Sequence, residues 1–144
     1  QTWAAFTVGH DGDTIESIQE TCNFAIENKF CFAAYNILMP YPGTPLYEKL
    51  KEEGRLLYDG KWWLHDEYKF NYSAILPKNM TPDELTEISF WCRKKFNSPF
   101  SIFRRAFDFK TNMRTPYRFF TYLIYNPLFR KEVHKKQGMK FGNK

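Results

Sequence analysis

The chain has 144 residues, of which 43% are hydrophobic, 26% charged and 19% aromatic, a size and composition that suit one domain with a single core. Ordinary counts of glycine (7) and proline (8) exclude collagen-like and low-complexity classes. No apolar run reaches the roughly 18 to 20 residues of a membrane-spanning helix. The formal net charge of +5 is unevenly distributed: residues 1–92 carry 7 basic and 14 acidic residues (net −7), and residues 93–144 carry 14 and 2 (net +12).

The N-terminal third predicts a β-α-β unit. Residues 3–8 form a short apolar run, and residues 32–39 form a continuous one, as expected of a strand that is covered on both faces in a parallel sheet. Between these runs, apolar residues recur at helical spacing over residues 15–26. Asp13, three residues before Glu16, predicts a capping box at the start of this helix.

Prolines that follow a capping side chain predict the later helices. A Thr, Ser or Asn directly precedes five of the prolines, a pairing typical of a helix N-terminus. The helices predicted in this way cover residues 45–53, 82–96, 99–109, 116–125 and 127–136. An irregular aromatic stretch separates the first two, and within it residues 72–76 are expected to be extended.

These elements predict an α/β fold in which parallel strands are followed by a helical extension. Two strands do not make a stable isolated sheet. Either further strands come from sequence outside this chain, or the exposed sheet edges pair with another copy of it.

Two loops follow the predicted strands, at the end of a parallel sheet where ligands bind. Residues 9–14, Gly-His-Asp-Gly-Asp-Thr, either offer helix N–H groups to a polar ligand or form a tight turn that needs glycine. They are not a phosphate loop, because no Gly-Lys-Ser/Thr follows. Residues 40–47, Pro-Tyr-Pro-Gly-Thr-Pro-Leu-Tyr, either reverse the chain or line a site through Tyr41 and Thr44.

Several segments occur in a characteristic order. They are the turn at residues 9–14, Phe-Ala-Ile-Glu-Asn at 24–28, Tyr-Asn-Ile-Leu-Met-Pro-Tyr-Pro-Gly-Thr-Pro-Leu-Tyr at 35–47, Glu-Gly-Arg-Leu-Leu at 53–57, Pro-Lys-Asn-Met-Thr-Pro-Asp-Glu-Leu at 77–85 and Gln-Gly-Met-Lys-Phe-Gly at 137–142. In this order the chain resembles the C-terminal half of radical S-adenosylmethionine (SAM) enzymes, specifically those that carry a cobalamin-binding domain.

The resemblance implies a fragment of a partial TIM-like (β/α) barrel. Residues 1–58 would supply its last βα units, residues 59–80 an irregular aromatic linker or lid, and residues 81–144 a helical, basic extension. Members of this family hold a [4Fe-4S] cluster on a C-x₃-C-x₂-C motif and cleave SAM to a 5′-deoxyadenosyl radical. The cobalamin-dependent members catalyse methyl transfer or ring closure.

The resemblance also implies the site residues. Those expected to face the nucleoside of SAM are Thr7, Val8, Gly9 and Asn36. Those expected at the open mouth, toward the substrate, are Tyr41, Thr44, Trp62 and Trp63. No catalytic residue and no metal ligand is implied within this chain.

The three cysteines do not form the cluster motif. Cys22 and Cys31 are nine residues apart and Cys92 is remote, so we expect free thiols in a reducing, cytoplasmic compartment. A zinc site lacks the usual paired ligand spacing, and a serine nucleophile lacks the Gly-x-Ser-x-Gly turn. We therefore expect the parent protein to be the enzyme, with the rest of its chain as partner. The present chain alone would bind no cluster, have no turnover and bind nucleosides weakly at most.

The basic C-terminal third combines aromatic residues at helical spacing with intervening Arg and Lys. One interpretation is a set of helices that pack on the barrel through their aromatics and leave a solvated basic face. A second is an amphipathic surface for anionic lipid, peripheral to a membrane, and a third, less favoured, is a groove for nucleic acid. The competing function is thus a non-catalytic interaction module. Its basic residues would be Arg104, Arg105, Arg114, Arg118, Arg130, Lys131, Lys135 and Lys136.

Overall fold

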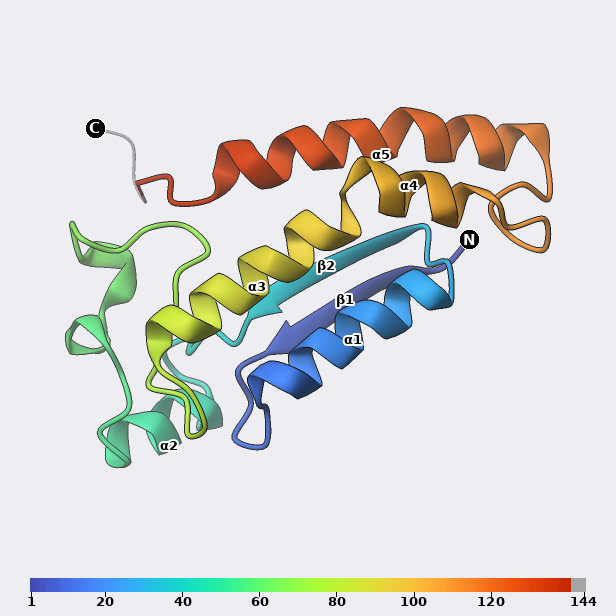
Figure 1. Cartoon of the computed structure of the whole chain (residues 1–144). Helices are drawn as coiled ribbons and strands as arrows, with labels where there is room; N and C mark the ends of the chain where they lie inside the picture. Colours follow the sequence, from blue (N-terminus) through green and yellow to red (C-terminus); the bar gives the residue numbers. More distant parts are fainter. Residues whose placement is uncertain (141–144) are drawn as a thin grey trace.

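The structure, a computed structural model, describes residues 1–140 and contains a two-stranded parallel sheet and five α-helices (Figure 1). In chain order the elements are β1 (Trp3–Val8), α1 (Ile15–Glu27), β2 (Phe32–Ile37), α2 (Pro45–Glu52), α3 (Pro82–Phe96), α4 (Pro99–Ala106) and α5 (Pro116–Lys136). The last two residues of the motif at 137–142 lie outside the described residues.

The β-α-β unit forms as predicted, but β2 ends two residues before the predicted run does. The expectation that this strand is covered on both faces is wrong, because Ala34 and Asn36 are exposed. β1 and β2 pair in parallel, with Trp3 beside Phe32 at one end and Val8 beside Ile37 at the other. Helices α1 and α3 lie side by side on the same face of the sheet (Figure 1). The core between them and the sheet contains Val8, Ile18, Cys22, Ala25, Ile26, Tyr35, Ile37, Leu85, Ile88, Cys92 and Phe96.

The opposite face of the sheet has no such cover. Side chains alternate between the two faces of a strand, so every second residue of β1 and β2 points away from α1 and α3. Phe32, on this side, is buried against Phe129 of α5, with the ring centroids 5.0 Å apart. The other residues of this face are exposed: Trp3, Ala5, Thr7, Ala34 and Asn36. Within the described residues, the sheet is therefore covered by helices on one face and largely exposed on the other.

The helix that follows β1 begins one residue later than predicted. Thr14, not Asp13, is the N-cap residue: its hydroxyl accepts from the Ser17 backbone N–H (3.2 Å), and the Ser17 hydroxyl accepts from the Thr14 N–H (2.9 Å). The expected capping box at Asp13 and Glu16 is wrong because the Asp13 carboxylate binds the preceding turn instead.

Four of the five capping pairs do begin helices. In each, the residue before the proline accepts a hydrogen bond from the backbone N–H three residues later, as an N-cap does. These N-caps are Thr44, Thr81, Ser98 and Thr115.

The fifth pair, Asn126-Pro127, lies inside a helix. The two helices predicted at 116–125 and 127–136 are one continuous helix, α5. Asn126 is fully buried, and its side-chain amide donates to the Tyr122 carbonyl one turn earlier (2.9 Å). The Tyr122 hydroxyl in turn donates to the Ile102 carbonyl of α4 (2.6 Å). These contacts fix the turn before Pro127 and join it to α4.

The segment between α2 and α3 has a small core of its own. Two short 3₁₀ turns, Tyr58–Gly60 and Trp62–Leu64, surround the buried Trp62, Tyr68 and Ala74. The extended piece predicted at residues 72–76 forms only an isolated antiparallel bridge between Ile75 and Leu56.

Helix α4 ends three residues earlier than predicted. It stops at Ala106, and the chain turns because the Asp108 carboxylate accepts from the backbone N–H groups of Lys110 and Thr111 (3.1 and 3.3 Å). An aspartate that binds N–H groups two and three residues later favours a turn over a helix.

A fully buried arginine joins the helical extension to the sheet. Arg105 donates to the carbonyls of Phe30 (2.7 Å), Cys31 (3.0 Å) and Phe96 (2.8 Å) and to the side chain of Asn126 (3.3 Å). Its guanidinium also lies 3.7 Å from the centre of the Phe96 ring. The expectation that Arg105 belongs to a solvated basic face or a basic binding surface is therefore wrong.

Candidate functional site

The residues expected beside a nucleoside lie at the carboxyl end of the strands. Thr7 and Asn36 are register partners on the uncovered face of the sheet, and both are exposed. Val8, between Thr7 and Gly9, points into the core instead. Its carbonyl accepts from the Leu38 N–H (2.8 Å), which extends the strand pairing beyond β2. Two polar side chains thus lie together at the strand ends.

The turn after β1 needs glycine at its first position. Gly9 has a φ of +100°, and a Cβ placed there would lie 2.7 Å from Cδ2 of the buried Leu85. The Asp13 carboxylate accepts from the N–H groups of Gly9 (2.7 Å) and His10 (2.9 Å). Because the Asp13 carboxylate already binds both N–H groups, these groups have a structural role in the turn.

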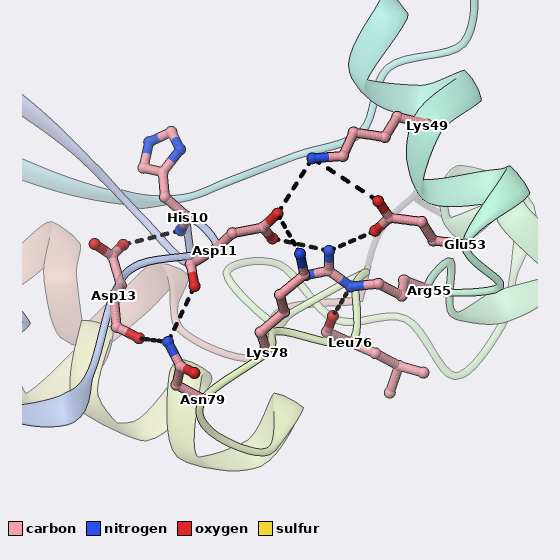
Figure 2. A network of polar contacts seen from close by, with 9 residues as sticks. All are labelled: His10, Asp11, Asp13, Lys49, Glu53, Arg55, Leu76, Lys78 and Asn79. Atoms are coloured by element: carbon pink, nitrogen blue, oxygen red, sulfur yellow. Dashed lines mark hydrogen bonds and ion pairs between the residues drawn. The ribbon is translucent and has the colours of Figure 1, made fainter.

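Asp11, in the same turn, is the centre of an ion-pair cluster. Its carboxylate lies 2.8 Å from Arg55, 3.0 Å from Lys78 and 3.2 Å from Lys49 (Figure 2). Glu53 pairs with Arg55 (2.8 Å) and Lys49 (3.8 Å). We call these five residues the Asp11 cluster. Hydrogen bonds from Lys78, Arg55 and Lys49 hold the pKa of Asp11 well below its usual range.

The Asp11 cluster connects three of the motifs that carry the family resemblance. The side-chain amide of Asn79, in the motif at 77–85, also donates to the backbone carbonyls of Asp11 (3.0 Å) and Asp13 (3.1 Å) (Figure 2). The motifs at 9–14, 53–57 and 77–85 therefore meet beside the strand ends. Each motif is visible in the sequence, but these contacts are not, because partners 38 to 68 residues apart leave no local pattern.

The residues expected at the mouth have different surroundings. Tyr41 is exposed, with its ring 6.0 Å from that of Trp62. Trp62 is buried, and its indole N–H donates to the Pro40 carbonyl (3.1 Å). The Thr44 hydroxyl caps α2 by accepting from the Tyr47 N–H (3.2 Å), and it donates to the Tyr41 carbonyl (2.7 Å).

Trp63 packs against Trp62 with ring centroids 5.6 Å apart, and it is half-buried. Tyr41, Thr44, Trp62 and Trp63 are thus brought together after β2. Among them, Tyr41 offers the most exposed side chain.

A groove of about 420 Å³ lies along β2, between this strand, α3, α5 and the turn at Phe70 and Asn71. Asn36 is one of its lining residues, so the groove reaches the strand ends. Its wall also includes Arg93, which is almost fully buried and donates to the Ser89 hydroxyl (2.9 Å). Burial lowers the pKa of Arg93 to about 10.

The described residues do not fit an iron–sulfur cluster. No group of three or more His, Cys, Asp or Glu side chains within residues 1–140 is arranged to hold a metal ion. All three cysteines are buried, and Cys22 and Cys92 point at backbone carbonyls across the α1–α3 contact. Burial raises the pKa of Cys31 to about 11, so this thiol stays protonated at neutral pH.

Two known enzymes are similar to part of this chain. The bacteriochlorophyllide d C-12(1)-methyltransferase of Chlorobaculum tepidum is 32% identical over 82 residues, which are 57% of this chain and 17% of that enzyme. The anaerobic magnesium-protoporphyrin IX monomethyl ester cyclase of Cereibacter sphaeroides is 30% identical over 86 residues, or 60% of this chain and 13% of that enzyme. No family model and no solved structure matches the chain.

The chain therefore spans less than a fifth of the length of either relative. Together the two similarities support a distant relation to the radical SAM enzymes, over part of the chain.

Proposed function

We propose that this chain is the C-terminal part of a cobalamin-dependent radical SAM enzyme. In this proposal β1 and β2 are the last strands of a partial (β/α) barrel, and their uncovered face belongs to its interior. Residues 59–80 lie over the mouth. Residues 81–140 form a helical extension, in which α3 lies on the outer face of the strands and α5 covers Phe32 at the amino end of β2.

The observation that carries this proposal is the one-sided sheet with polar side chains at its carboxyl end. Helices α1 and α3 cover one face, as the outer helices of a barrel do, while Thr7 and Asn36 lie on the uncovered face. Ligands of such folds bind at this end of the strands. The similarity to a methyltransferase and a cyclase supports the same family relation.

The role proposed for this chain is positioning. The exposed side chains of Thr7 and Asn36 would contact the nucleoside of SAM, and the residues after β2 would face the substrate. The Val8 carbonyl and the Gly9 N–H, already bound to Leu38 and Asp13, would hold the strand end and the turn in place. The cluster and cobalamin would be held by other parts of the parent chain, since the described residues provide no cluster ligands. Methyl transfer and ring formation are the two reaction classes that we propose for the parent.

The experiment that tests this proposal uses the parent enzyme, purified anaerobically from its complete reading frame. We expect a C-x₃-C-x₂-C motif upstream of Gln1 and reductive cleavage of SAM to 5′-deoxyadenosine. Asn36→Ala should raise the KM for SAM about tenfold, the effect of losing one good hydrogen bond. The control Asn28→Ala, at the exposed end of α1, should leave KM unchanged. A reading frame without the cysteine motif would refute the proposal.

A further inference from the structure

Helix α5 carries a continuous row of exposed side chains along one face. The row starts with four apolar residues, Tyr117, Phe120, Ile124 and Leu128, whose exposed fractions are 80%, 62%, 58% and 50%. It continues with two exposed cations, Lys131 and Lys135. Spacings of three and four residues place all six on one side of the helix. We call this row the α5 stripe.

The opposite side of α5 is the one that packs on the protein. Tyr122 and Asn126 are fully buried and bind α4 through the Ile102 carbonyl and the side chain of Arg105. Phe119 packs against the buried cluster of Cys31, Phe32, Ala106 and Tyr122. Helix α5 is thus attached by one side, and within the part of the chain that the structure describes nothing covers the α5 stripe.

Helix α4 and the turn after it add further exposed aromatic side chains. Phe100, Phe103 and Phe109 are 76%, 65% and 73% exposed, and Phe107 is also exposed. A scattered exposed apolar residue is ordinary, but a concentration on two neighbouring helices marks an interaction surface.

The charges on α5 are almost all positive. Its single acidic residue, Glu132, pairs with Lys136 at 2.8 Å and is therefore neutralised. Arg118, near the N-terminus of the helix, and Lys131 and Lys135 of the stripe have no carboxylate within ion-pair distance in residues 1–140. A surface of this kind attracts an anionic partner.

We propose that the α5 stripe binds the surface of an anionic lipid bilayer. Tyr117, Phe120, Ile124 and Leu128 would enter the boundary between headgroups and acyl chains, and Lys131 and Lys135 would contact lipid phosphates. The helix would lie along the surface, since none of the described helices is long and apolar enough to cross a membrane. Exposed Ile and Leu side chains favour lipid over nucleic acid, because aliphatic side chains provide no ring for base stacking. This inference does not depend on the proposed enzymatic function.

The experiment is co-sedimentation of the whole chain with vesicles. One set contains phosphatidylcholine and phosphatidylglycerol at about 7:3, and the other contains phosphatidylcholine alone. We expect binding to the anionic set at least tenfold stronger than to the neutral set, and weaker binding at about 0.5 M salt than at about 0.05 M.

Variants of the α5 stripe separate its apolar and cationic parts. Ile124→Ser should weaken binding to anionic vesicles about tenfold, because one buried aliphatic side chain is lost. Leu64→Ser is the matched control, an exposed apolar residue distant in sequence from α5, and should bind as the unmodified chain does. Lys131→Gln with Lys135→Gln should weaken binding about 25-fold at low salt, against no more than a small change for Lys51→Gln with Lys61→Gln.

Three results would overturn the proposal. They are equal binding by Ile124→Ser and the unmodified chain, tighter binding to a single-stranded oligonucleotide than to anionic vesicles, and a change of oligomeric state in Ile124→Ser without a change in lipid binding. Circular dichroism of each variant shows whether it is folded, and every substituted side chain is exposed, so the fold should be retained.

Discussion

Three glycines of the loops at the strand ends allow backbone conformation to be separated from side-chain overlap. Gly9 combines a φ of +100° with a Cβ position 2.7 Å from Leu85. Gly43 has a φ of +79° but nothing within 4 Å of its Cβ position, and Gly12 has neither feature. Positive φ costs an alanine about 1–2 kcal/mol, and overpacking of a buried side chain costs about 1–3 kcal/mol. We therefore expect free energies of unfolding to fall by about 2–5 kcal/mol in Gly9→Ala and about 1–2 kcal/mol in Gly43→Ala.

Urea denaturation followed by circular dichroism measures these differences, with Gly12→Ala as the control that stays within about 0.5 kcal/mol of the unmodified chain. In a Leu85→Ala background the overlap is removed, so the additional loss from Gly9→Ala should shrink to that of Gly43→Ala. Equal losses for Gly9→Ala and Gly43→Ala in the unmodified background would show that the overlap between Gly9 and Leu85 is not real.

Three further predictions concern charge and metal binding. The folded pKa of Asp11 lies below its unfolded value, so the Asp11 cluster stabilises the fold above about pH 4 and this stabilisation is lost as pH falls through the folded pKa. Carboxyl NMR titration should show a higher Asp11 pKa in Lys78→Met, and an unchanged pKa would contradict the ion pairs of the cluster. Arg105→Met leaves the carbonyls of Phe30, Cys31 and Phe96 without their donor. Urea denaturation should show a free energy of unfolding lower by about 3–5 kcal/mol, against about 0.5 kcal/mol or less for the exposed Arg104→Met. Anaerobic reconstitution of this chain with iron and sulfide should give no [4Fe-4S] absorbance, and a stoichiometric signal would refute our reading of the cysteines.

The β-α-β unit and most helix starts could be predicted because their signals are local. A capping side chain and a proline at the first helical position act on the backbone within one turn, and Thr81 with Pro82 begins α3 as predicted. The same signal failed at Asn126-Pro127. There the deciding contacts come from Ile102 and Arg105, which lie 20 and 21 residues before their partners Tyr122 and Asn126. No local sequence pattern indicates contacts over such a distance.

The net positive charge of the C-terminal third could be predicted from the sequence, but which of its basic residues are exposed could not. Arg104 and Arg105 are neighbours in sequence, yet Arg104 is exposed and Arg105 is fully buried. Composition cannot separate them, since burial of Arg105 depends on carbonyls supplied by three other segments. At the candidate site, similarly, the turn at residues 9–14 was identified, but the three cations around Asp11 were not.

The buried guanidinium of Arg105 has a geometric consequence for the whole helical extension. A planar group that donates in several directions fixes angles as well as distances, which apolar contacts do not. Sliding of α5 past α4 by one helical turn, about 5.4 Å, would remove the Asn126 acceptor and the Tyr122 contact together. Helices α4 and α5 therefore pack beside the strands in a single register. A surface that binds α5 would thus be held at a fixed angle to the carboxyl end of the sheet.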